Sequence, residues 1–319
     1  MKDKVLSLLS QNVGDYISGQ TMCSTLGVSR TTVWKTVNAL KQQGIAIEAV
    51  TKRGYCLTHL PDTLNQYRIA SYGDAWTAHI KVFDTVTSTN VVAKALAQKG
   101  CEEGTIILAE QQTAGKGRLG RAWSSPAQQG IWMTVVLRPQ FPPQHATGIT
   151  LLAALAVRRA IASVCGISPT IKWPNDVMLS GGKVCGILTE MHAEMEQIDY
   201  VLVGIGINVN TQKEEFPSCL QDIASSILIE TGKKIGRNTL IARILHEMKS
   251  LYVAYEGQLD AALLAEYYTH SNTIGRRIRV SQVGGEIIGT ADGMDSRGAL
   301  LVTDEKGCKH IVLSGDVSY

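Results

Sequence analysis

A glycine-rich loop at residues 111–121 holds side chains well suited to binding anions. It reads QQTAGKGRLGR, and its cations are Lys116, Arg118 and Arg121. Three of its glycines match the spacing of a dinucleotide-binding fingerprint, but Pro126 follows instead of a helix, and the acid expected about 20 residues later is missing. A Walker loop is excluded because no Gly-Lys-Ser/Thr ends the segment. We therefore expect a loop that closes over phosphates and a carboxylate while its cations neutralise them.

Three further motifs place polar groups beside glycines or apolar strands. The segment 172–176, KWPND, groups a cation, an amide and a carboxylate around a turn. Lys183 begins an otherwise apolar strand, which indicates an anionic partner, with snorkelling of the amine to solvent as the alternative. Gly204 and Gly206 lie on one face of a predicted strand, where a ligand can press against the backbone, and Asn208 follows at its rim. Together these motifs predict a site for an anionic ligand.

Alternating strand and helix patterns surround these motifs and predict a layered α/β or α+β domain. The predicted strands are 80–83, 105–110, 131–137, 170–173, 183–191 and 200–209, and the predicted helices are 90–98 and 147–164.

The first sixty residues have the pattern of a winged helix-turn-helix. A short helix begins near Val5, Ser18 and Ser29 can cap two more helices, and Gly27 makes the turn between them. Two alternating runs then form a hairpin with a cationic tip, which can reach phosphates while the third helix enters a major groove. A small three-helix adaptor without nucleic acid remains the alternative. The candidate DNA contacts are Arg30, Thr31, Lys35, Asn38, Lys52 and Arg53.

The pair Pro61-Asp62 is typical of a linker, and the end of the chain has a different pattern from the middle. From residue 272 onward, short alternating runs are separated by glycines. Such spacing predicts a small β-barrel. Its predicted strands are 277–281, 286–289, 299–302 and 309–313.

Charge is segregated along the chain, although the formal net charge is only +3. Residues 1–60 carry seven cations against three acids, and residues 111–175 carry seven cations and no acid. Two separate basic regions indicate two separate anionic partners. Seven cysteines show none of the paired spacings of a zinc or redox site. We expect a soluble cytoplasmic protein without a membrane partner, because the longest apolar run is 149–157 and the start is too polar for a secretory signal.

The sequence resembles the bifunctional biotin–protein ligases that also repress the biotin operon. The matching motifs follow the family's order and spacing and, with both flanking domains, extend the resemblance over the whole chain. They are TSTN at 87–90, Gln112, the loop 115–121, KWPND at 172–176, Lys183 with Gly186, and GIGIN at 204–208.

The resemblance implies an α+β protein of three domains. Residues 1–62 would form a winged helix-turn-helix DNA-binding domain. Residues 63–271 would form a mixed α/β catalytic domain of the class II synthetase-like type, which binds biotin and ATP. Residues 272–319 would form a small SH3-like β-barrel that helps hold ATP and the carrier protein.

The implied activity is that of an ATP-dependent, AMP-forming biotin–[acetyl-CoA-carboxylase] ligase. Biotin and Mg²⁺-ATP would give biotinyl-5′-AMP and pyrophosphate, and a lysine of the biotin carboxyl carrier protein of acetyl-CoA carboxylase would then take the biotin. A carboxylate and a triphosphate repel each other, so cations must lie between them. Operator DNA would be the second partner, bound by a homodimer that forms when biotinyl-AMP is present.

The resemblance also assigns the site residues. Lys183 would be the first catalytic candidate, with Arg118, Lys116, Arg121 and Asp176 beside it, and Asp176 would contact Mg²⁺ through the nucleotide or orient the acceptor amine. The ureido ring would be bound by Ser88, Thr89 and Gln112, and its walls would be Trp132, Gly186, Leu188, Gly204 and Gly206. The remaining ligand contacts would be Asn90, Gly115, Gly117, Trp123, Lys172, Asn175 and Asn208.

Two departures from the family pattern concern the nucleotide. Lys116 stands where the loop often has arginine, so the charge is kept but the bidentate fork is lost. No aromatic residue lies in 221–226, where some members stack the adenine. Two other functions stay open: a lipoate–protein ligase, which shares the adenylation chemistry, and a ligand-sensing regulator without catalysis.

Overall fold

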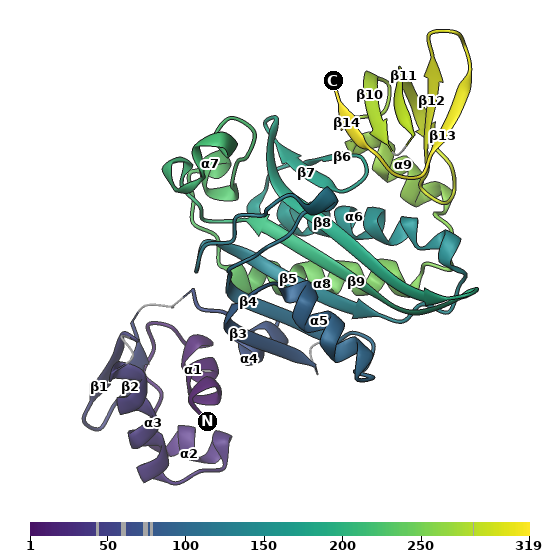
Figure 1. Cartoon of the computed structure of the whole chain (residues 1–319). Coiled ribbons are helices and arrows are strands. Elements are labelled where there is room, and N and C mark those ends of the chain that lie inside the picture. The colour runs from purple at the N-terminus through teal and green to yellow at the C-terminus, as the bar shows by residue number, and fades with distance from the viewer. Residues whose placement is uncertain (43–44, 59–61, 73–75, 77–78, 283) are drawn as a thin grey trace.

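The computed structural model describes residues 1–42, 45–58, 62–72, 76, 79–282 and 284–319. Figure 1 shows a small helical unit at the N-terminus, a large central sheet with helices on both faces, and a small sheet at the C-terminus. This is the mixed α and β architecture that the sequence predicts, in the predicted order.

The N-terminal unit is a winged helix-turn-helix. The Ser18 hydroxyl accepts a hydrogen bond from the Thr21 amide at 3.0 Å, so the predicted cap is confirmed. Gly27 ends that helix with a φ of +66°, a conformation that favours glycine. One face of each helix buries apolar side chains such as Leu9, Met22 and Val33 in a core of its own. The elements are α1 (Lys2–Ser10), α2 (Gly19–Leu26), α3 (Arg30–Gln42), β1 (Ile47–Val50) and β2 (Gly54–Leu57).

The central sheet has seven strands in the order β3-β4-β5-β9-β8-β7-β6, antiparallel except for the β3–β4 pair. Its strands are β3 (Ile80–Val86), β4 (Ile106–Gln112), β5 (Gly130–Leu137), β6 (Thr170–Lys172), β7 (Asp176–Leu179), β8 (Gly182–Glu194) and β9 (Gln197–Asn208). The helices of this part are α4 (Gln66–Ala70), α5 (Thr89–Gln98), α6 (Thr147–Cys165), α7 (Ile227–Thr231), α8 (Arg237–Val253) and α9 (Ala261–His270). Short 3-10 turns lie at Arg118–Gly120, Pro143–His145, Lys213–Glu215 and Ser218–Leu220.

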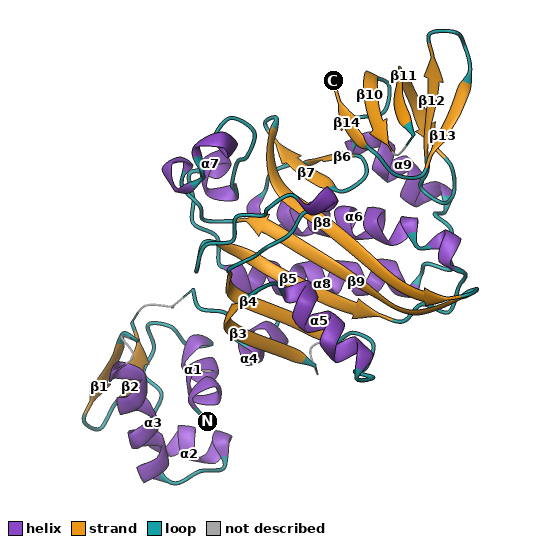
Figure 2. Ribbon diagram, in the orientation of Figure 1, coloured by secondary structure: helices purple, strands orange, loops and turns teal. Residues whose placement is uncertain are grey.

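The two faces of this sheet differ, and the difference places the site. In Figure 2, α6 and α8 lie behind the sheet and α5 lies in front of it. On β9, Val203 and Ile205 point into the main core with α6 and α8, whereas Leu202 packs under α5. Side chains alternate along a strand, so Gly204 and Gly206 follow Leu202 on the α5 face. That face is therefore left open just beyond the N-terminus of α5.

Helix α6 is the apolar element most similar to a membrane span. The stretch Pro143–Cys165 has the length and the apolar composition that would suit one, but most of its apolar part is buried within this protein. It packs against α8 and four strands of the sheet. The apolar sequence of α6 is thus accounted for by the core.

The C-terminal unit is a five-stranded antiparallel sheet in the order β13-β12-β11-β10-β14. The four predicted strands are present, and a fifth short strand, β14, pairs with β10 through Asp316 and Ser281. The strands are β10 (Arg277–Gln282), β11 (Gly285–Met294), β12 (Leu300–Asp304), β13 (Lys309–Val312) and β14 (Asp316–Ser318).

The predicted linker is fastened to the central domain. Pro61 lies outside the described residues, but Asp62 accepts a hydrogen bond at 3.0 Å from Nε of Arg237, whose side chain is fully buried. The same guanidinium group donates to Glu110 at 2.8 Å and to the Gly130 carbonyl at 3.1 Å. The boundary region is therefore held by α8, β4 and β5 together.

Part of the basic segment 111–175 serves the core. Arg158 and Arg159 on α6 both bind Glu266 of α9, at 2.9 and 2.5 Å. The hydrogen bond from Arg159, with smaller contributions from Arg158, holds the pKa of Glu266 below its ordinary value. Arg138 donates to the Cys101 and Asp199 carbonyls. These three arginines bind partners within the chain, so the charge count overstated the cations available to a ligand.

Candidate active site and DNA-binding surface

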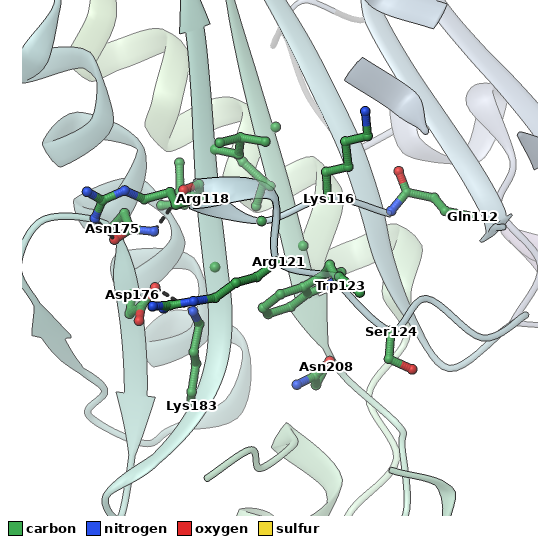
Figure 3. Close-up of a pocket in the computed structure, with 18 of the residues that line it drawn as sticks. Gln112, Lys116, Arg118, Arg121, Trp123, Ser124, Asn175, Asp176, Lys183 and Asn208 are labelled. Carbon is green, nitrogen blue, oxygen red and sulfur yellow. Dashed lines mark hydrogen bonds and ion pairs between the residues drawn. The ribbon is translucent and has the colours of Figure 1, made fainter. Parts of the chain in front are cut away.

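A cavity of about 230 Å³ opens on the α5 face of the central sheet. Its walls come from the N-terminus of α5, the glycine-rich loop, β8, β9 and the start of β14. Segments far apart in the sequence therefore meet here, as Figure 3 shows for ten labelled residues.

One end of the pocket is built from hydroxyl and amide groups. The Gln112 side-chain oxygen accepts from the Thr89 amide at 2.8 Å, and its nitrogen donates to Ser125 at 2.9 Å. Thr134 of β5 donates to Asn90 at 2.6 Å, which orients that amide. Ser88 precedes α5 without capping it through its side chain, and it lines the cavity. This end can satisfy a buried neutral polar ligand.

The floor of the pocket is formed by glycines, and an indole ring lies on two of them. A Cβ at Gly186 or Gly206 would meet the Trp123 ring at 2.8 or 2.5 Å, and one at Gly204 would meet Asn90 at 2.4 Å. The Trp123 indole N–H is buried and has no acceptor among the described residues. The glycines are thus needed for the close approach of Trp123 and Asn90 as well as for a ligand.

The glycine-rich loop is pinched at its base. Lys116 and Ala122 form an isolated antiparallel bridge, and the Gly117 amide donates to the Arg121 carbonyl at 2.7 Å. At the tip, Leu119 has a φ of +54° and is 75% exposed. This backbone directs Arg118 and Arg121 to the same side.

The opposite end of the pocket is ionic. Lys183 Nζ lies 2.7 Å from Asp176 Oδ1 and 5.3 Å from the centre of the Trp123 ring. The anionic partner that the sequence predicts for Lys183 is therefore Asp176, as Figure 3 shows. Arg118 donates to the Asn175 side chain at 3.1 Å.

A carboxylate from the C-terminal unit completes the ionic end. Asp316 Oδ2 lies 2.6 Å from Arg121 Nη2, and its Oδ1 lies 3.6 Å from Arg118 Nη1. The C-terminal unit is brought there by Trp173, whose backbone amide donates to Thr273 and whose indole donates to the Gly298 carbonyl, both at 3.1 Å. The tryptophan of the KWPND motif thus attaches the C-terminal unit to the central domain.

The pocket also has an apolar wall that the motifs do not predict. Phe216, Leu220, Ile223 and Ala224 line the pocket on the side of Lys183. The Ile223 carbonyl accepts from the Lys183 amide at 2.9 Å, which attaches this loop to β8. Ile223 is 60% exposed, an unusual position for a large apolar side chain. Only its place in the fold distinguishes it from other loop residues.

Most of the predicted ligand contacts line this one cavity, and three do not. Gly115 lies behind the loop, where a Cβ would meet the Trp123 carbonyl at 2.5 Å. Trp132 is buried, and its indole donates to the Pro126 carbonyl at 3.2 Å. Lys172 instead lies 5.1 Å from the ring centre of Tyr319. The predicted residues that line the cavity are Ser88, Thr89, Asn90, Gln112, Lys116, Gly117, Arg118, Arg121, Trp123, Asn175, Asp176, Lys183, Gly186, Leu188, Gly204, Gly206 and Asn208.

The pocket has limited capacity to hold a metal ion by itself. The described residues contain no group of three or more His, Cys, Asp or Glu side chains arranged for a metal. Cys185 lies behind the pocket, where burial, with a smaller contribution from Asp176, raises the pKa of its thiol far above the ordinary value. A hard cation could still use Asp176 or Asp316 together with ligand oxygens.

The predicted DNA contacts form an exposed surface on the N-terminal unit. Arg30, Thr31 and Lys35 on α3 are exposed, and Asn38 is partly buried. The hairpin tip is ordered locally, since Lys52 takes a φ of 70° and the Arg53 guanidinium stacks 4.1 Å from the centre of the Tyr16 ring.

Trp34 is a further residue of this surface that the motif analysis missed. It lies on α3 between the predicted contacts, and it is 56% exposed. An exposed tryptophan on the outer face of a helix is uncommon, because so large a side chain is usually buried for most of its area. The period of the helix could have identified it, because Val33 and Val37 define the buried face.

Comparisons with known proteins agree with this three-part architecture. The profile of the biotin/lipoate A/B protein ligase family matches residues 82–208, that of an HTH domain matches 2–56, and that of the biotin protein ligase C-terminal domain matches 273–319. The chain is 40% identical over 315 residues to the bifunctional ligase/repressor BirA of Bacillus spizizenii, covering 98% of this chain and 96% of that protein.

Two further similarities each cover about three quarters of the chain. The chain is 34% identical over 252 residues to the biotin–[acetyl-CoA-carboxylase] ligase of Mycobacterium tuberculosis, covering 77% of this chain and 90% of that protein. A solved structure of the Aquifex aeolicus biotin protein ligase in complex with biotin and ATP superimposes with a TM-score of 0.65 at 27% identity, covering 76% of this chain and 98% of that one.

Proposed function

The chain belongs to the family of bifunctional biotin ligase/repressor proteins, and from this premise we propose how its own residues perform both activities. It is a biotin–protein ligase that uses ATP, and a repressor with a DNA-binding domain. The observation that carries the residue assignment is the polarity of the pocket. Neutral hydrogen-bonding groups line one end, and Arg118, Arg121 and Lys183 line the other.

Biotin binds with its ureido ring at the neutral end. Ser88, Thr89 and Gln112 supply hydroxyl, amide N–H and amide groups there, and a buried ureido ring requires such partners. The valeryl chain then runs over the glycine floor beside Leu188. Its carboxylate then reaches the ionic end, where the cations of the pocket can bind it.

ATP places its phosphates at the ionic end. A carboxylate oxygen of biotin attacks the α-phosphorus, and the bond to pyrophosphate breaks, which gives biotinyl-5′-AMP. Lys183 lies where both anions meet, so its ammonium lowers their repulsion and stabilises charge that develops on the α-phosphate. Arg118 and Arg121 hold the adenylate by charge-assisted hydrogen bonds. Holding both reactants in line supplies part of the acceleration.

Mg²⁺ fits this site as an ion that arrives with the nucleotide. Asp176 would hold it together with phosphate oxygens, and the ion would supply positive charge next to the triphosphate. The adenine has an apolar wall to rest on, made of Leu220, Ile223 and Ala224. In this chain an aliphatic wall thus takes the place of an aromatic stack.

In the second half-reaction the ε-amine of a lysine on the carrier attacks the carbonyl carbon of the mixed anhydride, and AMP leaves. The carrier is the biotin carboxyl carrier protein of acetyl-CoA carboxylase. Asp176 lies beside Lys183 at the mouth of the pocket and orients the incoming amine. We place both activities in the cytoplasm, where this carrier and the operator are found.

Incubation of the purified protein with labelled biotin, ATP and the apo carrier fragment tests the ligase assignment. We expect biotin-dependent release of pyrophosphate, labelling of the carrier, and no labelling when lipoate replaces biotin. Transfer of lipoate in preference to biotin would support a lipoate ligase instead. Pyrophosphate release without any labelled carrier would reduce the protein to a ligand-sensing regulator.

The operator is read by α3 and the hairpin between β1 and β2. Arg30 and Lys35 contact the major groove side, Lys52 and Arg53 reach phosphates, and Trp34 presses on thymine methyl groups. Replacing Lys52 by Ala should weaken binding to all sequences and reduce the salt slope by about 1. Replacing Trp34 by Ala should instead reduce discrimination between operator and random DNA.

We further propose that biotinyl-AMP promotes a homodimer through the central sheet. β7 pairs with β8 only as far as Gly186, so among the described strands the outer half of β8 has a neighbour on one side only. Met191 in this half is 45% exposed, and Met195, which follows the end of β8, is fully exposed. Sedimentation should show a dimer with biotin and ATP together and a monomer with either alone. A monomer under all conditions would refute this assembly.

A further inference from the structure

Asp316 connects the C-terminal unit to the catalytic loop. It begins β14, and its carboxylate lies 2.6 Å from Arg121 and 3.6 Å from Arg118. Its side chain is only 25% exposed, and that of Arg118 is 23% exposed. Asp316 also lines the cavity that holds Lys183 and Asp176. A residue from outside the central domain is therefore part of the pocket wall.

Both partners of this contact are held by their own backbone. Asp316 pairs with Ser281 across the sheet, and a Cβ on the preceding Gly315 would meet Val280 at 2.5 Å, so this turn is tightly packed. On the other side, the bridge at the base of the glycine-rich loop directs the two arginines. The contact is thus a defined connection between two rigid supports.

The guanidinium groups that Asp316 engages are those that bind phosphate in the proposed function. The ionic end contains three cations matched by two carboxylates, since Lys183 is paired with Asp176 at 2.7 Å. Asp316 meets these guanidinium groups as a charge partner, because its buried Oδ2 has no hydrogen-bond partner among the described residues and Arg118 donates to Asn175 instead. A phosphate that enters must therefore compete with Asp316 for the same positive charge, and two neighbouring anions repel each other.

We propose that Asp316 is a positioning residue whose carboxylate neutralises part of the charge of Arg118 and Arg121, and that the phosphates of the nucleotide displace it from them. This rests on the proposed function, which places the nucleotide at this end of the pocket. Asp316 holds the loop over the pocket and lowers the affinity for phosphate ligands. Pyrophosphate, which has no adenosine to compensate, is affected most, so the exchange favours release of the product.

The test measures pyrophosphate and ATP binding by calorimetry for the full-length protein and the variant Asp316→Asn. We expect the variant to bind pyrophosphate about fivefold more tightly, with a smaller gain for ATP and unchanged affinity for biotin. The change is isosteric, so unchanged biotin affinity also reports that the variant is folded. Steady-state rates should show a lower KM for ATP and stronger product inhibition by pyrophosphate, with kcat lowered where release limits turnover.

Two controls separate this exchange from a general effect of charge or structure. Glu305→Gln removes a carboxylate from the same C-terminal unit, where it pairs with the exposed Arg277, and it should leave pyrophosphate affinity unchanged. In an Arg121→Gln background, Asp316→Asn should have little further effect, because its main partner is already gone.

The direction in which the affinity for pyrophosphate changes decides the outcome. Weaker or unchanged pyrophosphate binding by Asp316→Asn would overturn the exchange and leave Asp316 as a structural contact. The proposed function is judged separately by the wild-type protein. If that protein formed no adenylate from biotin and ATP, the nucleotide assignment would fail, whatever the variant did.

Discussion

Arg237 and Arg121 each face a carboxylate, but their surroundings differ. The Arg237 side chain is fully buried and binds Asp62, Glu110 and a backbone carbonyl. The Arg121 side chain is 70% exposed and binds Asp316. Removing a buried charge from several partners leaves each of them uncompensated, whereas an exposed arginine can exchange one anion for another at small cost. The first arginine fastens the boundary region to the central domain, and the second is suited to ligand exchange.

The burial of charged partners therefore separates a permanent contact from an exchangeable one. Lys183 lies between these extremes, with 32% of its side chain exposed and one carboxylate partner at 2.7 Å. It is held in place, yet its ammonium can still meet a ligand. Substitutions at Arg237, Lys183, Arg118 and Glu266 test this gradation.

The largest effect is expected at the buried arginine. Arg237→Met should lower the free energy of unfolding by about 3–5 kcal/mol, because Asp62 and Glu110 lose their charge partner in a buried site. Urea unfolding, followed by tryptophan fluorescence, measures this loss in the free energy of unfolding. The matched control is Arg243→Met on the same helix, where the pair with Glu247 is partly exposed and about 1 kcal/mol or less is expected. Equal losses in the two variants would contradict the distinction.

Lys183→Ala should reduce the rate of adenylate formation from biotin and ATP by about 100- to 1,000-fold, with little change in stability. The reason is that the ammonium stabilises charge at the reacting centre, and the carboxylate that loses its partner, Asp176, is partly exposed. Pyrophosphate release in a single turnover measures it. Lys94→Ala, an exposed position on α5, serves as the control. Undiminished release by the Lys183 variant would refute its catalytic assignment.

Arg118→Ala should speed the dissociation of biotinyl-5′-AMP by about 10- to 100-fold, the range expected for one charge-assisted hydrogen bond. Its folding should be nearly unaffected, since its partners Asn175 and Asp316 keep other contacts or some exposure. Release of labelled adenylate into a biotin chase measures the rate. A stability loss comparable to that of Arg237→Met would place Arg118 with the permanent contacts.

The smallest effect is a pH dependence at Glu266. Its pKa is lowered in the folded state, first by the hydrogen bond from Arg159, so its contribution is present above the unfolded-state pKa and is lost as pH falls through the folded value. The stability difference between wild type and Glu266→Gln should be about 1 kcal/mol near neutral pH and should shrink below about pH 4. A difference independent of pH would show that packing, and not charge, makes the contribution.

Local features of the sequence predicted the elements well. The Ser18 cap and the left-handed Gly27 depend on residues a few positions away, so α2 and its turn could be placed from the sequence. The glycine-rich loop was predicted to present cations, and it does so through Arg118 and Arg121. Helices α7 to α9 and the short strand β14 were not predicted, because their patterns are brief or are dominated by tertiary contacts.

The sequence could not place side chains whose neighbours lie far along the chain. Lys172 has the composition of a ligand contact, but the fold turns it toward Tyr319. Ile223 and Phe216 have no distinctive composition, and only the loop that returns to β8 makes them part of the pocket wall. The charge count includes Arg158 and Arg159 among the cations of the basic segment. In the fold, both bind Glu266 of α9 and are therefore not available to a ligand.

Periodicity, caps and the clustering of cations beside glycines belong to neighbouring residues, and these already define the three units and the chemistry of the central one. Tertiary contacts decide which arginines pair with carboxylates inside the protein. Arg237 and Asp62, for example, are 175 positions apart in the sequence. Electrostatic energies depend on distance and burial, and neither quantity exists until the chain has folded.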